Sequence, residues 1–317
     1  MEFTFRWAGD AETVRVRGSI ESVGDAELAR NGDEWATTLD LPPDVRAIYW
    51  IALDGEDDWT RWHVDPSNPK RYVYPADLFF TRGQEVVASL LEGPEAQPLS
   101  WSTERDVPHG ELGCDELAGR RVWRYTPPAE PEALLLLFDG REYTSLAPAH
   151  VVLDNLLAEG LIPPTAAILP DSVEHALRVR DLDESRDFLD WCVDTLIPWS
   201  GFEAPRERTV VGGSSFGGKA SLFFARERPD VFGGAVVQSG GFPGMPVEIP
   251  PRRSQRFWLD AGIFEDQLLD SVRTLRDDLE AKGYDVGYRE FPGGHDFVWW
   301  RETLADGLAH VLRPGGP

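Results

Sequence analysis

A serine lies at the centre of the pattern that is best suited to chemistry in this 317-residue chain. The segment Gly213-Ser214-Ser215-Phe216-Gly217 follows an apolar run typical of a strand and precedes a run with helical spacing. This is the G-x-S-x-G pattern of a nucleophile elbow, whose glycines allow a sharp turn from strand to helix. We therefore predict Ser215 as a nucleophile and the backbone N–H of Phe216 as one donor of an oxyanion hole.

A serine hydroxyl becomes a good nucleophile only when a base takes its proton, and histidine is the usual base. His295 lies in Gly293-Gly294-His295-Asp296, directly after the last predicted strand and before the final predicted helix. In α/β-hydrolases the chain order is serine, acid, histidine, with the histidine on this loop. We predict His295 as the base. The other histidines are predicted on the surface (His63, His310), in a connector (His109), at a helix start (His150) and in an irregular loop (His175).

The orienting acid is expected on the loop after the preceding strand, which the sequence places near Phe257–Leu259. Asp260 comes early enough to belong to that strand, whereas Glu265 and Asp266 follow a glycine. Either of these two could instead cap the next helix. We favour Glu265 as the acid and keep Asp266 as the alternative.

A second oxyanion donor normally comes from the loop after an early strand. Gly140 and Arg141 occupy that place, and their N–H groups are our candidates, although the same glycine also fits a plain β-turn. Arg141, Arg178 and Arg180 are predicted on loops that follow strand ends, where ligands bind in open α/β sheets. They could form a locally positive substrate pocket, or each could pair with a surface carboxylate.

The spacing of apolar residues divides the chain into two regions. Up to about residue 101 short alternating runs separated by turns predict a β-sandwich. From about residue 120 strands alternate with helices, which predicts an α/β fold with a mostly parallel, doubly wound sheet. We place the boundary in the polar stretch 102–119 and predict an all-β accessory domain over 1–104 and a catalytic α/β-hydrolase domain over 105–317.

The composition restricts the partners. A formal net charge of −24 argues against nucleic acid and anionic membranes, because phosphate binding requires a basic surface. No apolar run reaches the ~20 residues of a membrane span, and the N-terminus lacks a signal-peptide pattern, so we expect a cytoplasmic protein. Cys114 and Cys192 fit no metal or redox spacing. We expect neither a metal nor an organic cofactor.

With these residues in place, the chain resembles the enterochelin (enterobactin) esterases, siderophore esterases of the esterase D type. The resemblance implies an immunoglobulin-like N-terminal module and hydrolysis of the lactone esters of a cyclic tricatecholate, with iron released in the cell. It also implies Ser215 and His295 as nucleophile and base, Glu265 at the acid position, and Arg178 facing the catecholate; some members work as a Ser–His dyad. The motifs that carry the resemblance are Leu137-Phe138-Asp139-Gly140, Arg178 with Asp181-Leu182, Gly212 to Gly218, Gln238-Ser239-Gly240, Gly293 to Asp296, and, in the N-terminal half, Trp35, Tyr49 and Asp65-Pro66-Ser67-Asn68.

Two departures from the family pattern leave the exact siderophore open. The family often has Glu-Leu where this chain has Asp181-Leu182, and an aromatic pair where it has Gly241-Phe242-Pro243. One alternative is an esterase acting on carbohydrate-linked esters, of the feruloyl or acetyl type, with Trp59 and Trp62 stacking on sugars. Another is a non-catalytic binding protein on a hydrolase scaffold, which the presence of both Ser215 and His295 disfavours.

Overall fold

The computed structural model describes residues 1–20, 26–242 and 254–313. The chain forms two compact units, and the first joins the N-terminal region to two short segments from late in the sequence. It comprises Met1–Pro98, Gly262–Asp266 and Glu290–Trp299, and the second comprises Leu99–Ala261, Gln267–Arg289 and Trp300–Pro317.

The first unit is built from two antiparallel sheets, a three-stranded one in the order β1-β5-β4 and a five-stranded one in the order β3-β2-β6-β8-β7. Exposed and buried residues alternate along β7, as expected for a strand with one face on a core. All but the last residue of the central strand β6 are buried. The elements are β1 (Glu2–Ala8), β2 (Val14–Gly18), β3 (Ala26–Glu27), β4 (Ala29–Asn31), β5 (Glu34–Asp40), β6 (Arg46–Leu53), the 3₁₀ helix η1 (Trp59–Arg61), β7 (Arg71–Tyr74) and β8 (Val86–Glu92).

The core of the first unit includes a side chain from late in the sequence. Phe264 is buried in the same apolar cluster as Phe5, Val14 and Ile51, and Ile263 packs against that cluster. The late segment is therefore part of the hydrophobic core of the N-terminal unit.

The second unit contains a mixed eight-stranded sheet in the order β16-β15-β14-β13-β11-β12-β10-β9. Strands β11 to β15 pair in parallel, whereas β9 and β10 pair antiparallel at one edge. Every residue of β11 to β15 is buried, as expected for parallel strands covered on both faces. The strands are β9 (Glu111–Leu117), β10 (Arg120–Thr126), β11 (Ala133–Leu137), β12 (Thr165–Pro170), β13 (Thr209–Ser214), β14 (Gly234–Gln238), β15 (Arg256–Gly262) and β16 (Asp285–Phe291).

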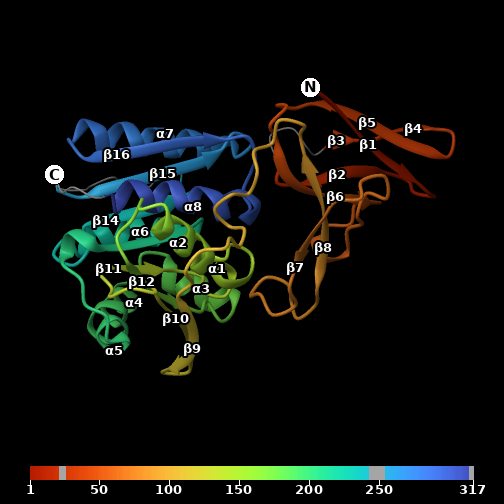
Figure 1. Cartoon of the computed structure of the whole chain (residues 1–317). Coiled ribbons are helices and arrows are strands. Elements are labelled where there is room, and N and C mark those ends of the chain that lie inside the picture. The colour runs from red at the N-terminus through yellow and green to blue at the C-terminus, as the bar shows by residue number, and fades with distance from the viewer. Residues whose placement is uncertain (21–25, 243–253, 314–317) are drawn as a thin grey trace. The chain divides into compact units, whose positions relative to one another are not determined.

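Helices connect these strands, and Figure 1 shows α7 lying alongside β15 and β16. The buried face of α7 consists of leucines and a valine at helical spacing, which join the core of the second unit. The helices are α1 (Glu142–Ser145), α2 (Ala149–Ala158), α3 (His175–Leu182), α4 (Arg186–Trp191), the π-helical turn η2 (Cys192–Leu196), α5 (Ile197–Ser200), the 3₁₀ helix η3 (Arg206–Arg208), α6 (Phe216–Glu227), α7 (Asp266–Ala281) and α8 (Phe297–Val311).

The prediction of an α/β domain after an all-β region is confirmed, with two local corrections. His175, Arg178 and Arg180 lie on helix α3, not on a loop. Strand β9 lies within the predicted connector. All but one of its residues are exposed, so the strand has no alternation of buried and exposed positions that its sequence could reveal. The boundary predicted at residue 104 stays a prediction, and the compact units themselves divide near residue 98.

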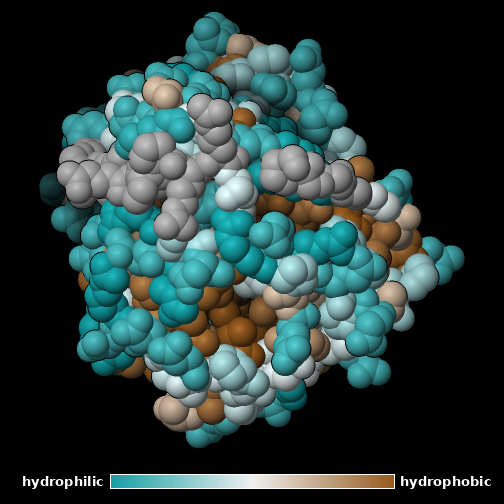
Figure 2. Space-filling view, turned by 90° about the vertical axis from the view of Figure 1, so that its left-hand side faces the viewer, coloured by the Kyte–Doolittle hydropathy of each residue, from teal (hydrophilic) through white to brown (hydrophobic). Residues whose placement is uncertain are grey.

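The charge of −24 leads one to expect a hydrophilic surface. Figure 2 shows hydrophilic residues over most of the face that it presents, with apolar residues at the floor of a hollow. In residues 1–20, 26–242 and 254–313, no helix is both long and apolar enough to cross a membrane.

We expect Phe264→Ala to lower the free energy of unfolding by about 3–5 kcal/mol, because it removes a buried ring from the first unit. Urea denaturation followed by tryptophan fluorescence measures the loss. The control is Val73→Ala, on an exposed position of β7, which should change stability by less than about 0.5 kcal/mol. Equal effects of the two substitutions would contradict the placement of Phe264 in this core.

Candidate active site

Ser215 occupies a strained turn between β13 and α6. Its backbone has φ 57° and ψ −123°, a region that residues with a side chain rarely adopt. Its N–H donates to the carbonyl of Gln238 at the end of β14 (2.8 Å), which ties the turn to the neighbouring strand. Phe216 is the first residue of α6, so its N–H has no partner within the helix. Its ring lies 5.3 Å from that of Phe242, and Pro243 of the predicted departure lies outside the described residues.

The glycines of the elbow are required by close backbone contacts. A Cβ atom on Gly213 would lie 2.7 Å from the backbone carbon of Gly217, closer than real Cβ atoms come. A Cβ atom on Gly218 would meet the carbonyl oxygen of Gln238 at 2.9 Å. Gly213, the first glycine of the G-x-S-x-G pattern, therefore allows the close backbone approach that a sharp strand-to-helix turn requires.

A buried ion pair lies next to the elbow. Both guanidinium contacts of Arg178 to the Asp139 carboxylate are 2.7 Å, and the Arg178 side chain is 8% exposed. The same guanidinium donates to the carbonyl of Ser214 (3.4 Å) and lies 5.7 Å from the centre of the Phe216 ring. The hydroxyl of Ser172 donates to Asp139 as well. Arg178 thus contacts residues on both sides of Ser215 in the sequence, and its charge is neutralised by Asp139.

The predicted oxyanion loop follows β11. The N–H of Gly140 donates to the carbonyl of Pro170 (2.9 Å), so that group is already engaged. Gly140 is needed for close packing, since a Cβ atom there would lie 2.3 Å from the carbonyl oxygen of Leu169. Arg141, directly before α1, is buried with its guanidinium 5.3 Å from the centre of the Trp123 ring. Of the two candidate donors, we therefore retain the N–H of Arg141.

A second carboxyl group is buried directly after this loop, at the first residue of α1. Burial and, to a smaller extent, the charge of Asp139 raise the pKa of Glu142, and the charge of Arg178 opposes this rise; the resulting pKa is about 8. Asp139 itself has a positive φ of 56°, so strain and buried charge coincide at the end of β11.

Glu265 and His295 meet within the first unit. Nδ1 of His295 lies 2.7 Å from a carboxylate oxygen of Glu265, whose side chain is 2% exposed, whereas that of His295 is 34% exposed. The other Glu265 oxygen accepts from the N–H of Gly262 (2.6 Å). Asp266 is exposed at the start of α7, and Asp260 is buried within β15, where it accepts from the Trp258 indole (3.1 Å). A carboxylate bonded to Nδ1 fixes the tautomer and the orientation of the imidazole ring.

Asp296, the neighbour of His295, is buried. Its carboxylate accepts from the N–H of Val298 (2.9 Å). Burial and, to a smaller extent, the charge of Glu265 raise the pKa of Asp296, and hydrogen bonds from Ser19, Val298 and the backbone of Ile48 oppose this rise; the resulting pKa is about 7. Asp296 is not among the predicted catalytic or substrate-binding residues, although its place beside the predicted base was a signal.

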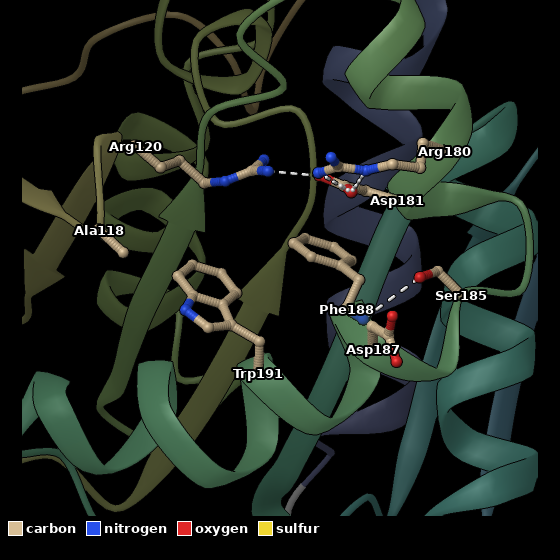
Figure 3. Close-up of a pocket in the computed structure, with 8 residues that line it drawn as sticks. All are labelled: Ala118, Arg120, Arg180, Asp181, Ser185, Asp187, Phe188 and Trp191. Carbon is tan, nitrogen blue, oxygen red and sulfur yellow. Dashed lines mark hydrogen bonds and ion pairs between the residues drawn. The ribbon is translucent and has the colours of Figure 1, made fainter.

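Arg180, the remaining candidate arginine, lines a cavity of about 410 Å³ in the second unit (Figure 3). Its side chain is 65% exposed and pairs with Asp181, to which Arg120 also donates. Phe188 and Trp191 stack at 5.6 Å and form aromatic walls. Because Asp181 neutralises much of the arginine charge, the cavity is aromatic and polar without being strongly cationic.

The structure brings the predicted residues together in two groups. In the second unit, Arg178 lies next to the elbow that contains Ser215 and Phe216. In the first unit, Glu265 and His295 form a hydrogen-bonded pair. Within the described part of the chain, no group of three or more His, Cys, Asp or Glu side chains could hold a metal ion.

The fold and the serine elbow define an α/β-hydrolase-type protein. A family model described as "Putative esterase" matches residues 121–311. The match covers more than half of the chain, and the chain belongs to this esterase family.

The similar proteins include iron(III) enterobactin esterases. The chain is 30% identical over 260 residues to the iron(III) enterobactin esterase of Escherichia coli K12, covering 73% of this chain and 65% of that protein. It is 29% identical over 229 residues to the iron(III) enterobactin esterase of Dickeya dadantii, covering 62% of this chain and 53% of that protein. The matches thus span between about half and two thirds of these relatives' lengths. The predicted resemblance to the enterochelin esterases is confirmed.

A solved structure extends the likeness to the whole chain. The enterobactin esterase of Shigella flexneri, crystallised in the presence of enterobactin, superposes with a TM-score of 0.76 at 25% identity. The superposition covers 98% of this chain and 92% of that chain, so both the all-β region and the α/β region have counterparts there.

We expect Arg178→Met to lower the free energy of unfolding by about 3–5 kcal/mol, because it leaves the buried Asp139 carboxylate without its cation. The matched control is Arg180→Met, the same change two residues along α3. The Arg180 side chain is 65% exposed and its partner Asp181 keeps the contact with Arg120, so this change should cost at most about 1 kcal/mol. Chemical denaturation at pH 7 measures both. A loss for Arg178→Met no larger than for Arg180→Met would contradict the buried pair.

We expect Asp296→Asn to change how stability depends on pH. Because the folded-state pKa of Asp296 is raised to about 7, the folded protein binds more protons than the unfolded chain between about pH 4 and 7. This residue therefore contributes a stability that is greatest at low pH and lost as the pH rises to about 7. The unfolding free energy of the variant relative to the wild type should rise by about 2–4 kcal/mol between pH 4.5 and 8, measured by urea titration at each pH. A constant difference would show that Asp296 titrates normally.

Proposed function

We propose that this chain is a serine esterase that hydrolyses the ester bonds of a catecholate siderophore of the cyclic trilactone type, so that iron is released in the cytoplasm. The observation that carries the proposal is the match to relatives named iron(III) enterobactin esterases, at 28–30% identity over 229 to 279 residues. The strained Ser215 and the Glu265–His295 pair supply residue types suited to ester hydrolysis.

In the proposed mechanism, Nε2 of His295 takes the proton of the Ser215 hydroxyl while the serine oxygen bonds to the ester carbonyl carbon. The tetrahedral intermediate collapses, the bond to the alcohol oxygen breaks, and the imidazolium returns the proton to that oxygen. Water then attacks the acyl-serine in the same way, which releases the acid and restores the hydroxyl. Glu265 holds the imidazole by its Nδ1–H and stabilises its positive charge during both steps.

We assign the oxyanion hole to the N–H groups of Phe216 and Arg141. The first lies at the N-terminus of α6, where the helix dipole favours negative charge. Gly140 contributes by close packing, because its own N–H donates to Pro170. Any ferric ion belongs to the substrate.

The arginines divide into two proposed roles. Arg178 is buried against Asp139 and adjoins Ser214 and Phe216, which suits it to hold the elbow. Arg180 is exposed, which suits it to contact an anionic substrate despite the acidic protein. For the finer architecture, we propose that residues 1–104 form an immunoglobulin-like sandwich and that the hydrolase domain over 105–317 has a doubly wound sheet.

We expect the wild type to convert a cyclic tricatecholate trilactone into linear trimer, dimer or monomer, and Ser215→Ala to lose at least about 10³-fold in kcat. Loss of the hydroxyl removes the attacking atom. Mass spectrometry of the products over time measures the cleavage, and a nitrophenyl ester serves as a generic substrate. Circular dichroism checks that the variant is folded.

The outcomes separate the alternatives. Cleavage of the nitrophenyl ester without cleavage of the trilactone would overturn the siderophore assignment and favour a carbohydrate-linked ester, to be tested with feruloyl and acetyl sugars. Wild-type inactivity on all esters, with binding of the trilactone retained, would favour a binding protein. Full activity of Ser215→Ala would exclude this serine as the nucleophile.

A further inference from the structure

The proposed acid and base are carried by the two late segments that belong to the N-terminal unit. Glu265 lies in Gly262–Asp266 and His295 in Glu290–Trp299. The two segments are bonded to each other: the N–H of Phe264 donates to the carbonyl of Gly293 (3.1 Å). They therefore form one structural piece within this unit, anchored by the burial of Phe264 in its core.

Strand β6 makes direct hydrogen bonds to the histidine segment through Arg46. The backbone N–H of Arg46 donates to the carbonyl of Pro292 (3.0 Å), and its carbonyl accepts from the indole N–H of Trp299 (2.7 Å). The guanidinium of Arg46 lies 5.5 Å from the centre of the Trp299 ring, and this ring stacks on Phe291 at 5.2 Å. These contacts hold the segment shortly before and shortly after His295.

The residues on either side of His295 are also packed against the N-terminal region. A Cβ atom on Gly294 would lie 1.8 Å from the carbonyl oxygen of Ser19, so only glycine fits the observed approach. Asp296 is buried among groups that include the Ser19 hydroxyl and the backbone of Ile48. The side chain of His295 itself stays partly exposed.

We propose that the N-terminal unit positions the catalytic base: Arg46 and Trp299 are positioning residues that fix the His295 loop so that Glu265 and His295 keep their hydrogen bond. The proposal rests on the proposed function, since it assigns His295 the role of base. It gives the all-β region a part in the reaction beyond any contact with substrate. The physical reason is that general-base catalysis depends on position, and a shift of about 1 Å can lower the rate about 100-fold.

The test uses the full chain and the variant Trp299→Phe. Phenylalanine keeps an aromatic ring beside Phe291 and Arg46 but removes the N–H that donates to the Arg46 carbonyl. We expect kcat for a nitrophenyl ester to fall about 10- to 100-fold with little change in KM, because the reacting groups are displaced and binding is not. Gly294→Ala is the second variant and should act in the same direction.

The matched control is Trp50→Phe, which lies on the same strand as Arg46. Its indole N–H donates to the carbonyl of Val87 (2.8 Å), and its ring contacts are with other aromatic residues of the N-terminal region. This variant loses a hydrogen bond of the same type, from an indole N–H to a backbone carbonyl, at a part-buried position, and should also be destabilised. It should keep the wild-type kcat, because its contacts are not with the His295 segment.

A spectroscopic readout separates positioning from general stability. The His295 Nδ1–H proton, hydrogen-bonded to Glu265, should give a downfield proton NMR resonance that is absent in Glu265→Gln. We expect this resonance to shift or broaden in Trp299→Phe and Gly294→Ala and to stay unchanged in Trp50→Phe.

Wild-type kcat and an unchanged resonance in both Trp299→Phe and Gly294→Ala would overturn the proposal. An equal loss of kcat in Trp50→Phe would overturn it too, because the effect would then be one of general stability. If the wild type hydrolysed no ester, the proposed function would fail, whereas the resonance would still decide whether the N-terminal unit sets the geometry of the pair.

Discussion

The hydrogen bond between Glu265 and His295 is the contact on which the proposed chemistry depends. Both residues belong to the compact unit that contains the N-terminal all-β region. A buried carboxylate is costly unless it is fully bonded, and here its two oxygens accept from the Gly262 N–H and face the imidazole. Both residues sit on segments that continue the strands β15 and β16 of the α/β sheet into the compact N-terminal unit. The chain therefore passes from one unit to the other along these two strands.

Strained backbone conformations with positive φ angles occur just after the ends of neighbouring strands. Asp139, Ser215 and Ser239 have positive φ angles and follow β11, β13 and β14, which are adjacent in the sheet. Such conformations persist only where the surroundings determine them, and they concentrate at functional sites. Here the surroundings are specific: Asp139 is paired with Arg178, and the Ser215 and Ser239 N–H groups donate to carbonyls of the next strands. The end of the sheet that carries the proposed nucleophile is thus held by an ion pair and by backbone hydrogen bonds between neighbouring strands.

The features of the fold and of the candidate site that depend on local sequence patterns could be predicted from the sequence. The elbow at Ser215, the loop histidine His295 and the parallel strands followed from spacing and from the chain order of α/β-hydrolases. The partner of Arg178 did not follow, because a pairing between α3 and the end of β11 depends on tertiary packing that periodicity does not encode. The packing of residues 262–266 and 290–299 with the N-terminal unit was missed for the same reason. The glycines next to His295 were visible in the sequence, but the Ser19 carbonyl that requires Gly294 was not.

The division of the chain between two compact units has a consequence for stability and activity. A substitution in the core around Phe5 and Phe264 acts on the unit that carries Glu265 and His295, far along the sequence from the elbow. With Ser215 and His295 in the roles that we propose, local loosening of the all-β unit should lower the reactivity of Ser215 before the α/β core unfolds, because a serine hydroxyl without its base is a weak nucleophile. On the proposed function, the N-terminal region is part of the catalytic framework, because one hydrophobic core builds the proposed nucleophile and another holds the proposed base.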